Sequence, residues 1–326
     1  MLHRLTNLIT IGNLQMNFCN EITVESSWTL LTDTATIVIP KSITVENKPI
    51  VDGAKAVFKI GDKVKIEAGY NFEHDTIFTG YVTEVKTKYP LEIRCEDQMW
   101  LFKQKSYKKT FKTVTVKQLI DYLMATLGEK FPVDYSDAGV QLGKFRINNA
   151  TGAQVLEELR KKYGIYSFFR EGTMYVGFVY SHASPGYRKR IPLQYTPNII
   201  EDDLTFHAAE NQKVKVKATS ILADNKQLSI EVGDGDGRVI EQVFYNLGKA
   251  DLEKVAKNVL ATWKVSGLEG TLETFGKPFV RQSDAIKLAN NKISEQNGTY
   301  LVKSVTRKFG QNGYRQAIEI DRKVSL

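Results

Sequence analysis

Two stretches near opposite ends of the chain carry the same β-strand pattern, and this duplication constrains the fold more than any single motif. In each stretch, a small residue and an Asp turn the chain into an alternating strand, and a Gly and a Tyr lead into a second strand. These positions are Gly61, Asp62, Gly80 and Tyr81 in the first copy and Ser283, Asp284, Gly298 and Tyr300 in the second. A hairpin written twice predicts two similar barrels, an architecture that favours assembly over chemistry.

Length and composition are those of a globular protein with two or three domains. The chain has 326 residues, 42% of them hydrophobic and 25% charged, so each domain can bury its own core. No apolar run approaches the ~20 residues that span a membrane. Residues 1–16 lack the layout of a secretory signal. We therefore expect a protein that is made in the cytoplasm and stays there or leaves it within a larger assembly.

The spacing of the apolar residues divides the chain into three parts. Residues 1–105 alternate like short strands, which is typical of a small antiparallel barrel. Residues 106–200 change to the 3.6-residue period of helices and predict an inserted α+β domain. Residues 201–326 return to strands, with one helix near residues 252–263 and an Asn312-Gly313 pair that predicts a hairpin turn before the last strand. The predicted fold is mainly β, with two similar small antiparallel β-barrels flanking the α+β domain.

The insert contains the same helix signature twice. The pattern Thr-x-x-Gln, a capping box, occurs at residues 115–118 and again at residues 151–154. Gly128 and Gly164 stand at the same distance behind each Thr, where glycine commonly ends a helix. Two copies are too few for a solenoid. The pattern therefore predicts two capped helices, each followed by strand-like sequence.

Metal and cofactor sites are not indicated. Cys19 and Cys95 are the two cysteines of the chain, and we expect both to be buried, reduced thiols. The four histidines are scattered without ligand spacing. Residues 233–237 read Gly-Asp-Gly-Asp-Gly but lie between strands and lack the remaining calcium ligands, so they predict a hairpin turn. We expect no metal and no cofactor.

Catalysis is a weak alternative. Residues 201–203 and Glu210 could supply paired carboxylates for a glycosidase, but nothing in the sequence fixes an acid and a base across a cleft. The chain has no Gly-x-Ser-x-Gly elbow and no recognisable cysteine nucleophile motif. We predict that the protein is not an enzyme.

Three groups of side chains leave binding functions open. The aromatic residues of the insert could line the groove of a cell-wall or glycan-binding module, or form its core: Tyr163, Tyr166, Phe168 and Phe169. A basic cluster with interleaved aromatics could bind single strands, or could be a solvated connection: Lys103, Lys105, Tyr107, Lys108, Lys109, Phe111 and Lys112. The stripe of Lys213, Lys215 and Lys217 fits either a solvated strand face or a channel wall or interface.

The order and spacing of these patterns resemble the tail-hub family of contractile injection machines. That family includes the phage late-control protein D, baseplate hub proteins and the hub part of VgrG-like proteins. The matching residues are Gly61-Asp62-x-Val64-x-Ile66, Phe78-x-Gly80-Tyr81-Val82-x-x-Val85, Ile93-x-Cys95-Glu96-Asp97 with Leu101, and Gly298-x-Tyr300-Leu301-Val302-x-x-Val305-x-x-x-Phe309 with Gly313-Tyr314.

The resemblance implies a structural role without catalysis. It implies a homotrimer in which two barrels per subunit present six around a channel, joining a hexameric tail tube to a threefold spike. Tube and spike proteins would be the partners, with no membrane contact and with DNA only as possible cargo. The place would be a virion tail baseplate or a phage-tail-like particle assembled in the bacterial cytoplasm. Because no spike repeat or lytic domain follows, we expect these to be separate polypeptides.

Overall fold

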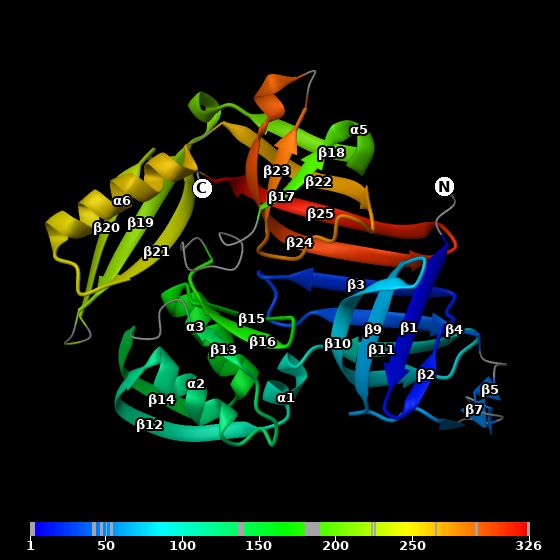
Figure 1. Cartoon of the computed structure of the whole chain (residues 1–326). Coiled ribbons are helices and arrows are strands. Elements are labelled where there is room, and N and C mark those ends of the chain that lie inside the picture. The colour runs from blue at the N-terminus through cyan, green and yellow to red at the C-terminus, as the bar shows by residue number, and fades with distance from the viewer. Residues whose placement is uncertain are drawn as a thin grey trace.

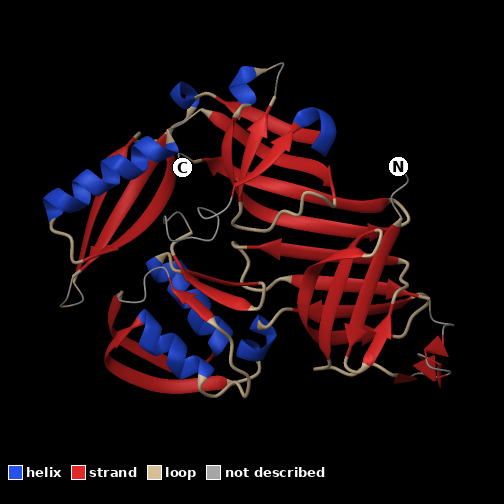
Figure 2. Cartoon of the chain, in the orientation of Figure 1, coloured by secondary structure: helices blue, strands red, loops and turns tan. Residues whose placement is uncertain are grey.

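The strands of the protein belong mostly to one large sheet (Figures 1 and 2). The computed structural model describes residues 4–40, 44–45, 48–49, 51–52, 55–135, 140–179, 190–222, 224, 226–264, 266–290 and 293–324. In this part of the chain, 13 strands form the sheet, and its main path runs β18-β22-β25-β24-β3-β4-β11-β10-β9-β1-β2. The protein is therefore mainly β, as the sequence predicts, and helices lie outside this sheet.

The first half of the sheet is built from the N-terminal residues. Its strands are β1 (Leu5–Ile11), β2 (Leu14–Met16), β3 (Glu21–Ser27), β4 (Thr34–Ile39), β9 (Lys63–Tyr70), β10 (Glu73–Lys86) and β11 (Leu91–Glu96). Burial alternates along β4, because every second residue of a strand faces the core. The short hairpins β5 (Thr44–Val45) with β6 (Lys48–Pro49) and β7 (Val51–Asp52) with β8 (Lys55–Ala56) lie between β4 and β9 in the chain.

The second half of the sheet comes from the C-terminal residues. Its strands are β17 (Arg190–Gln194), β18 (Ile199–His207), β22 (Gly267–Phe275), β23 (Ala285–Ala289), β24 (Gly298–Gly310) and β25 (Gly313–Lys323). The predicted turn before Tyr314 is present, with Gly313 at φ +96°. The short helices α5 (Tyr195–Asn198) and η2 (Ser294–Gln296) complete this half. Strand β17 falls in the range expected for the insert, yet it pairs with β23.

The two halves repeat one strand order. Strands β3, β4, β11, β10 and β9 are neighbours in the first half, and β18, β22, β25, β24 and β23 are neighbours in the same order in the second. A bulge follows Val82 on β10 and Val302 on β24, at the same point of each copy. Within the described residues, the pairing closes neither half into a barrel. Instead β24 is long enough to pair with β23, β25 and also β3, which joins the halves side by side (Figure 1).

The insert packs around a separate core and lies at the lower left of Figure 1, beside the first half of the sheet and below the second. Its elements are α1 (Met99–Lys103), β12 (Ser106–Thr115), α2 (Val116–Met124), β13 (Val133–Tyr135), β14 (Gln141–Thr151), α3 (Gly152–Tyr163), β15 (Tyr166–Arg170) and β16 (Thr173–Gly177). Both predicted capping boxes are confirmed, at Thr115 and at Thr151. Gly164 ends α3 in the left-handed conformation as predicted, whereas α2 ends at Met124, before Gly128.

A second small layer interrupts the C-terminal half. It contains η1 (Ala209–Asn211), β19 (Val214–Ile221), β20 (Gln227–Gly233), β21 (Arg238–Tyr245) and α6 (Lys249–Trp263). The prediction that residues 233–237 form a hairpin turn is wrong, because β20 and β21 do not pair with each other. Both pair with β19, antiparallel and parallel respectively, so the segment crosses over the end of β19. Helix α6 covers one face of this three-stranded sheet and shares its apolar core.

None of the helices described in the structure is long and apolar enough to cross a membrane.

Candidate functional site: the junction of the two halves and the insert

The first predicted turn is a compact, hydrogen-bonded unit at the start of β9. Asp62 accepts a hydrogen bond from the Lys59 amide (2.8 Å), and the Asp62 amide donates to the Lys59 carbonyl (3.1 Å). Gly61, at φ +91°, donates to the Val82 carbonyl (2.8 Å), and the Val82 amide donates to the Asp62 carbonyl (2.9 Å). The Asp is therefore needed to close the turn, and the small residue to adopt a left-handed backbone.

The second turn repeats this unit bond for bond. Asp284 accepts from the Arg281 amide (2.8 Å), and its amide donates to the Arg281 carbonyl (3.1 Å). Ser283, at φ +61°, donates to the Val302 carbonyl (2.9 Å), and the Val302 amide donates to the Asp284 carbonyl (2.8 Å). The duplication seen in the sequence is thus present in the backbone.

The Gly and the Tyr of the second strand do not correspond between the two copies as the sequence suggested. Gly80 pairs with Val64, and Tyr300 pairs with Ile286, so Gly80 of the first copy occupies the place of Tyr300 in the second. Position 80 requires a glycine, since a Cβ there would lie 2.1 Å from the Glu96 carbonyl oxygen. Tyr300 is fully buried, and its hydroxyl accepts a hydrogen bond from the Leu268 amide (3.3 Å). A Cβ at Gly298 would likewise meet the Lys323 side chain at 2.8 Å.

Each turn is an attachment point for the insert. At the first, Glu129 accepts a hydrogen bond from the Tyr81 hydroxyl (2.6 Å) and pairs with Lys63 (3.0 Å). Burial opposes ionisation of Glu129, but the hydrogen bonds from Tyr81 and Lys63 outweigh it and lower the pKa of this carboxyl. Tyr81 also stacks on Trp100, with ring centroids 5.3 Å apart.

At the second turn, the insert contributes a cation instead. Arg170, at the end of β15, pairs with Asp284 (2.5 Å) and donates to the Ser283 hydroxyl (3.3 Å) and the Gln282 carbonyl (3.1 Å). Only 1% of the Asp284 side chain and 14% of the Arg170 side chain are exposed. A buried pair of this kind is strongly destabilising to break, because the remaining charge has no partner.

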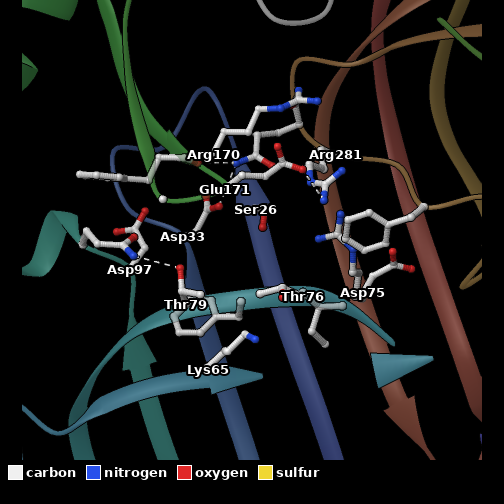
Figure 3. A pocket seen from close by; sticks show the side chains of 18 of the residues that line it. Ser26, Asp33, Lys65, Asp75, Thr76, Thr79, Asp97, Arg170, Glu171 and Arg281 are labelled. Atoms are coloured by element: carbon white, nitrogen blue, oxygen red, sulfur yellow. Dashed lines mark hydrogen bonds and ion pairs between the residues drawn. The ribbon is translucent and has the colours of Figure 1, made fainter. Parts of the chain in front are cut away.

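A cavity of about 600 Å³ lies beside the second turn, where both halves and the insert meet (Figure 3). We call it the junction cavity. It is lined by charged residues of all three parts, including Asp33, Asp97, Arg170, Glu171, Arg281 and Arg307. None of these was singled out from the sequence for a function. Arg307 could have been found, because the alternation Val305-x-Arg307-x-Phe309 places a charge on the apolar face of a strand.

Two buried carboxyls, Asp33 and Asp97, form one wall of the junction cavity. Asp33 accepts hydrogen bonds from the Ser27 amide (3.0 Å) and from Gln282 (2.9 Å). Burial raises the pKa of Asp33 to about 7, although these hydrogen bonds and Arg307 act in the opposite direction. Burial and the negative charge of Asp33 raise the pKa of Asp97 well above its usual value. Both carboxyls therefore keep their protons to a higher pH than carboxyls in water do.

Lys215 and Lys217 lie on the face of β19 that α6 does not cover, and Lys213 lies just before this strand, but the charges of all three lysines are balanced. Lys213 pairs with Asp236 (2.5 Å), which belongs to the segment that crosses over the end of β19. Lys215 pairs with Glu231 (3.3 Å) on β20, and Lys217 with Glu241 (3.3 Å) on β21. The stripe is therefore part of a mixed-charge surface and not an isolated cationic one.

The aromatic residues do not form an open groove. Phe168 and Phe169 are buried, Tyr166 packs edge-to-face on Trp28, and Tyr163 stacks with Tyr245. In the basic cluster, Tyr107 is buried and donates to the Leu123 carbonyl (2.9 Å), while Phe111 packs on Tyr122. The first set thus serves packing, which was its alternative interpretation. In the basic cluster the two aromatic residues pack within the insert, while the lysines at positions 103, 105, 108, 109 and 112 are exposed.

The other candidate groups carry no visible site in the described residues. Residues 201–203 lie on β18, which pairs only with β22 and so forms an edge of the large sheet. No group of His, Cys, Asp and Glu able to hold a metal occurs in the part of the chain that the structure describes. Cys95 is buried and Cys19 half-buried, both free, and burial raises the pKa of each thiol to about 12.

Comparison with known proteins gives matches in structure alone. No family model matches the chain, and no curated protein sequence matches it. Among solved structures, a tail protein from Neisseria meningitidis matches with a TM-score of 0.67 at 16% identity, covering 98% of this chain and 96% of its own. The 43 kDa tail protein of prophage MuSo2 from Shewanella oneidensis matches with a TM-score of 0.65 at 15% identity, over 97% and 98%.

The chain has the fold of phage tail proteins. A third match has a TM-score of 0.61 at 10% identity and covers 97% of this chain and 77% of the other. It is the E. coli c3393 protein, a component of the type VI secretion system with structural similarity to the T4 bacteriophage tail proteins gp27 and gp5. This tail fold extends over both halves and the insert, because the matches cover nearly the whole chain.

Proposed function

We propose that the protein is a structural hub of a phage-tail baseplate or of a related contractile injection machine, related to late-control protein D and the hub part of VgrG-like proteins. The observation that carries the proposal is the duplicated half-sheet, in which the same turn, strand order and bulge occur twice. Similarity in fold to phage tail and type VI secretion proteins supports it.

In this proposal three copies form a closed ring. Each copy contributes two similar halves, so the ring presents six similar surfaces. Each half would act as one barrel-like unit of the ring. A hexameric tail tube would bind one side and a threefold spike the other, with DNA passing only as cargo. The division into residues 1–105, 106–200 and 201–326 would correspond to hub unit, insert and hub unit. The protein would have no catalytic role.

The lysine stripe has a place in this arrangement. Lys213, Lys215 and Lys217 would face the lumen or a subunit interface, and their carboxylate partners would keep that surface close to neutral. The turn residues would act indirectly, by fixing the insert against both halves. The protein would be located in the baseplate of a virion or a phage-tail-like particle.

Light scattering coupled to size exclusion tests the proposal. We expect a mass near 111 kDa, three times the 36.9 kDa of one chain. If the protein alone is a monomer, mixing it with candidate spike and tube proteins should produce the trimer. A chain that stays monomeric alone and in those mixtures contradicts the hub function.

A further inference from the structure

Arg307 is a buried cation without a counterion in direct contact. It is 2% exposed, points to the inner face of β24 and lines the junction cavity. One guanidinium nitrogen, Nη2, donates to the Val280 carbonyl, while Nε has no hydrogen-bond partner. Among the described residues, no carboxylate lies within ion-pair distance of Arg307. An unpaired buried charge is costly, so its retention requires an explanation.

Two further arginines increase the positive charge at this place. Arg281 and Arg307 both lie 4.4 Å from the centre of the Phe279 ring. Arg170 approaches from the insert, and the like charges of neighbouring arginines lower the pKa of Arg281 and of Arg307, after the larger effect of burial. Arg170 is neutralised by Asp284 and Arg281 by Glu171 (2.6 Å), whereas Arg307 has no carboxylate in direct contact and is attracted to Asp33 and Asp284 only at longer range.

The acidic residues of the cavity wall already have other partners. Glu171 pairs with Arg281, Asp75 pairs with Lys277, and Asp97 accepts a hydrogen bond from the Met99 amide (3.0 Å). Asp33 is held by Ser27 and Gln282, and burial favours its uncharged form. The basic side chains that the first half contributes to the cavity wall also have partners, because Lys65 pairs with Glu67 (2.8 Å) and the His74 ring hydrogen-bonds Thr6 (2.9 Å).

We propose that the junction cavity binds a small oxyanion, with its phosphate or carboxylate group held by Arg307 and Arg281. A guanidinium group presents two parallel N–H donors, which match the spacing of two oxygens of a carboxylate or of a phosphate. The aromatic ring of Phe279 holds both arginines in place, so the donors are ordered before the anion arrives. A cavity of about 600 Å³ can hold an organic anion as well as inorganic phosphate.

Isothermal titration of the full chain with inorganic phosphate and, separately, with citrate at constant ionic strength and pH 7 tests this proposal. We expect saturable binding of at least one of them, and the comparison tells which oxyanion class the site prefers. Arg281→Gln should raise Kd at least tenfold, because one donor pair is removed. Arg307→Gln should abolish saturable binding. Arg315→Gln is the matched control, since Arg315 lies 4.8 Å over the Phe275 ring, outside the junction cavity, and should change Kd less than twofold.

Arg307→Gln could also disturb folding, so circular dichroism and thermal unfolding accompany each titration. Arg307→Lys keeps the charge but loses the paired donors, and should weaken binding at least tenfold while the fold is kept. The proposal is overturned if neither anion binds saturably at concentrations up to about 10 mM. It is also overturned if the folded Arg281→Gln and Arg307→Lys variants bind like the unchanged protein.

Discussion

Raising the pH from 5 to 8 should destabilise this protein, and replacing Asp97 by Asn should remove part of that loss. Asp33 and Asp97 are buried next to each other, and both have raised pKa values in the folded chain. Below the unfolded pKa of about 4, both states are protonated and nothing is lost. As the pH rises toward the folded pKa, the unfolded chain releases these protons and the folded chain retains them, so stability falls with increasing pH.

The magnitude follows from the shift of Asp33 alone. Its pKa rises from 3.8 to about 7. At 1.36 kcal/mol per pKa unit, this corresponds to about 4 kcal/mol across the full window, of which about 3 kcal/mol falls between pH 5 and 8. Carboxyls with lowered pKa values, such as Glu92 at about 2, complete their titration below this range and do not mask the effect. A loss of this size lowers Tm by several degrees.

Differential scanning calorimetry from pH 5 to 8 measures this loss. The Asp97→Asn variant keeps an oxygen that can accept from the Met99 amide but carries no charge to repel Asp33. Its Tm should therefore exceed that of the unchanged protein by an amount that grows with pH. Asp121→Asn serves as control, since Asp121 is 52% exposed, pairs with Lys117 and accepts a hydrogen bond from Tyr135 (3.2 Å) at the surface, and its offset should be constant. A Tm difference for Asp97→Asn that stays constant or shrinks with rising pH refutes the reasoning.

Three further predictions concern the insert and the turns. Tyr81→Phe should cost about 1–2 kcal/mol by removing the hydrogen bond to Glu129, with the ring stack retained, as checked by urea unfolding at pH 7. Thr151→Ala should cost about 1 kcal/mol through loss of the α3 cap, and Thr151→Ser, which keeps the hydroxyl, should cost less. Gly61→Ala should destabilise by about 1 kcal/mol, because a Cβ is strained at positive φ. Ser283→Gly and Ser283→Ala both lose the hydrogen bond from Arg170, but only Ser283→Gly relieves the strain, so it should be the more stable of the two. A Ser283→Ala variant as stable as Ser283→Gly would contradict the equivalence of the two turns.

Local patterns predicted the elements of the fold well. The capping boxes and the Asn-Gly turn before Tyr314 are decided within a few residues, so they were readable in the sequence and are confirmed. The connection formed by residues 233–237 could not be predicted in this way. Whether the two strands that it joins pair with each other depends on a third strand, β19, which lies between them. The pairing of β24 with β3 was equally hidden, since it joins residues nearly 300 positions apart.

The residues around the junction cavity were equally hard to predict from local patterns. The two turns were found because their residues repeat, but their contacts with Glu129 and Arg170 are long-range and leave no local pattern. Burial also decides what a charged residue does. Asp33 lies in a polar stretch that gives no sign of a raised pKa, which arises only from the desolvation imposed by the assembled halves and insert.

The duplicated turn finally explains how similar halves can take different roles. Both copies use the Asp to close the turn, yet the first presents Tyr81 and Lys63 to an acidic residue of the insert, and the second presents Asp284 to a basic one. An insert carrying Glu129 at one point and Arg170 at the other therefore fits in a single orientation, since the reverse would bring like charges together. In the proposed ring, the six halves would share one backbone arrangement and alternate between two charge patterns, which would let a sixfold tube and a threefold spike bind the same hub.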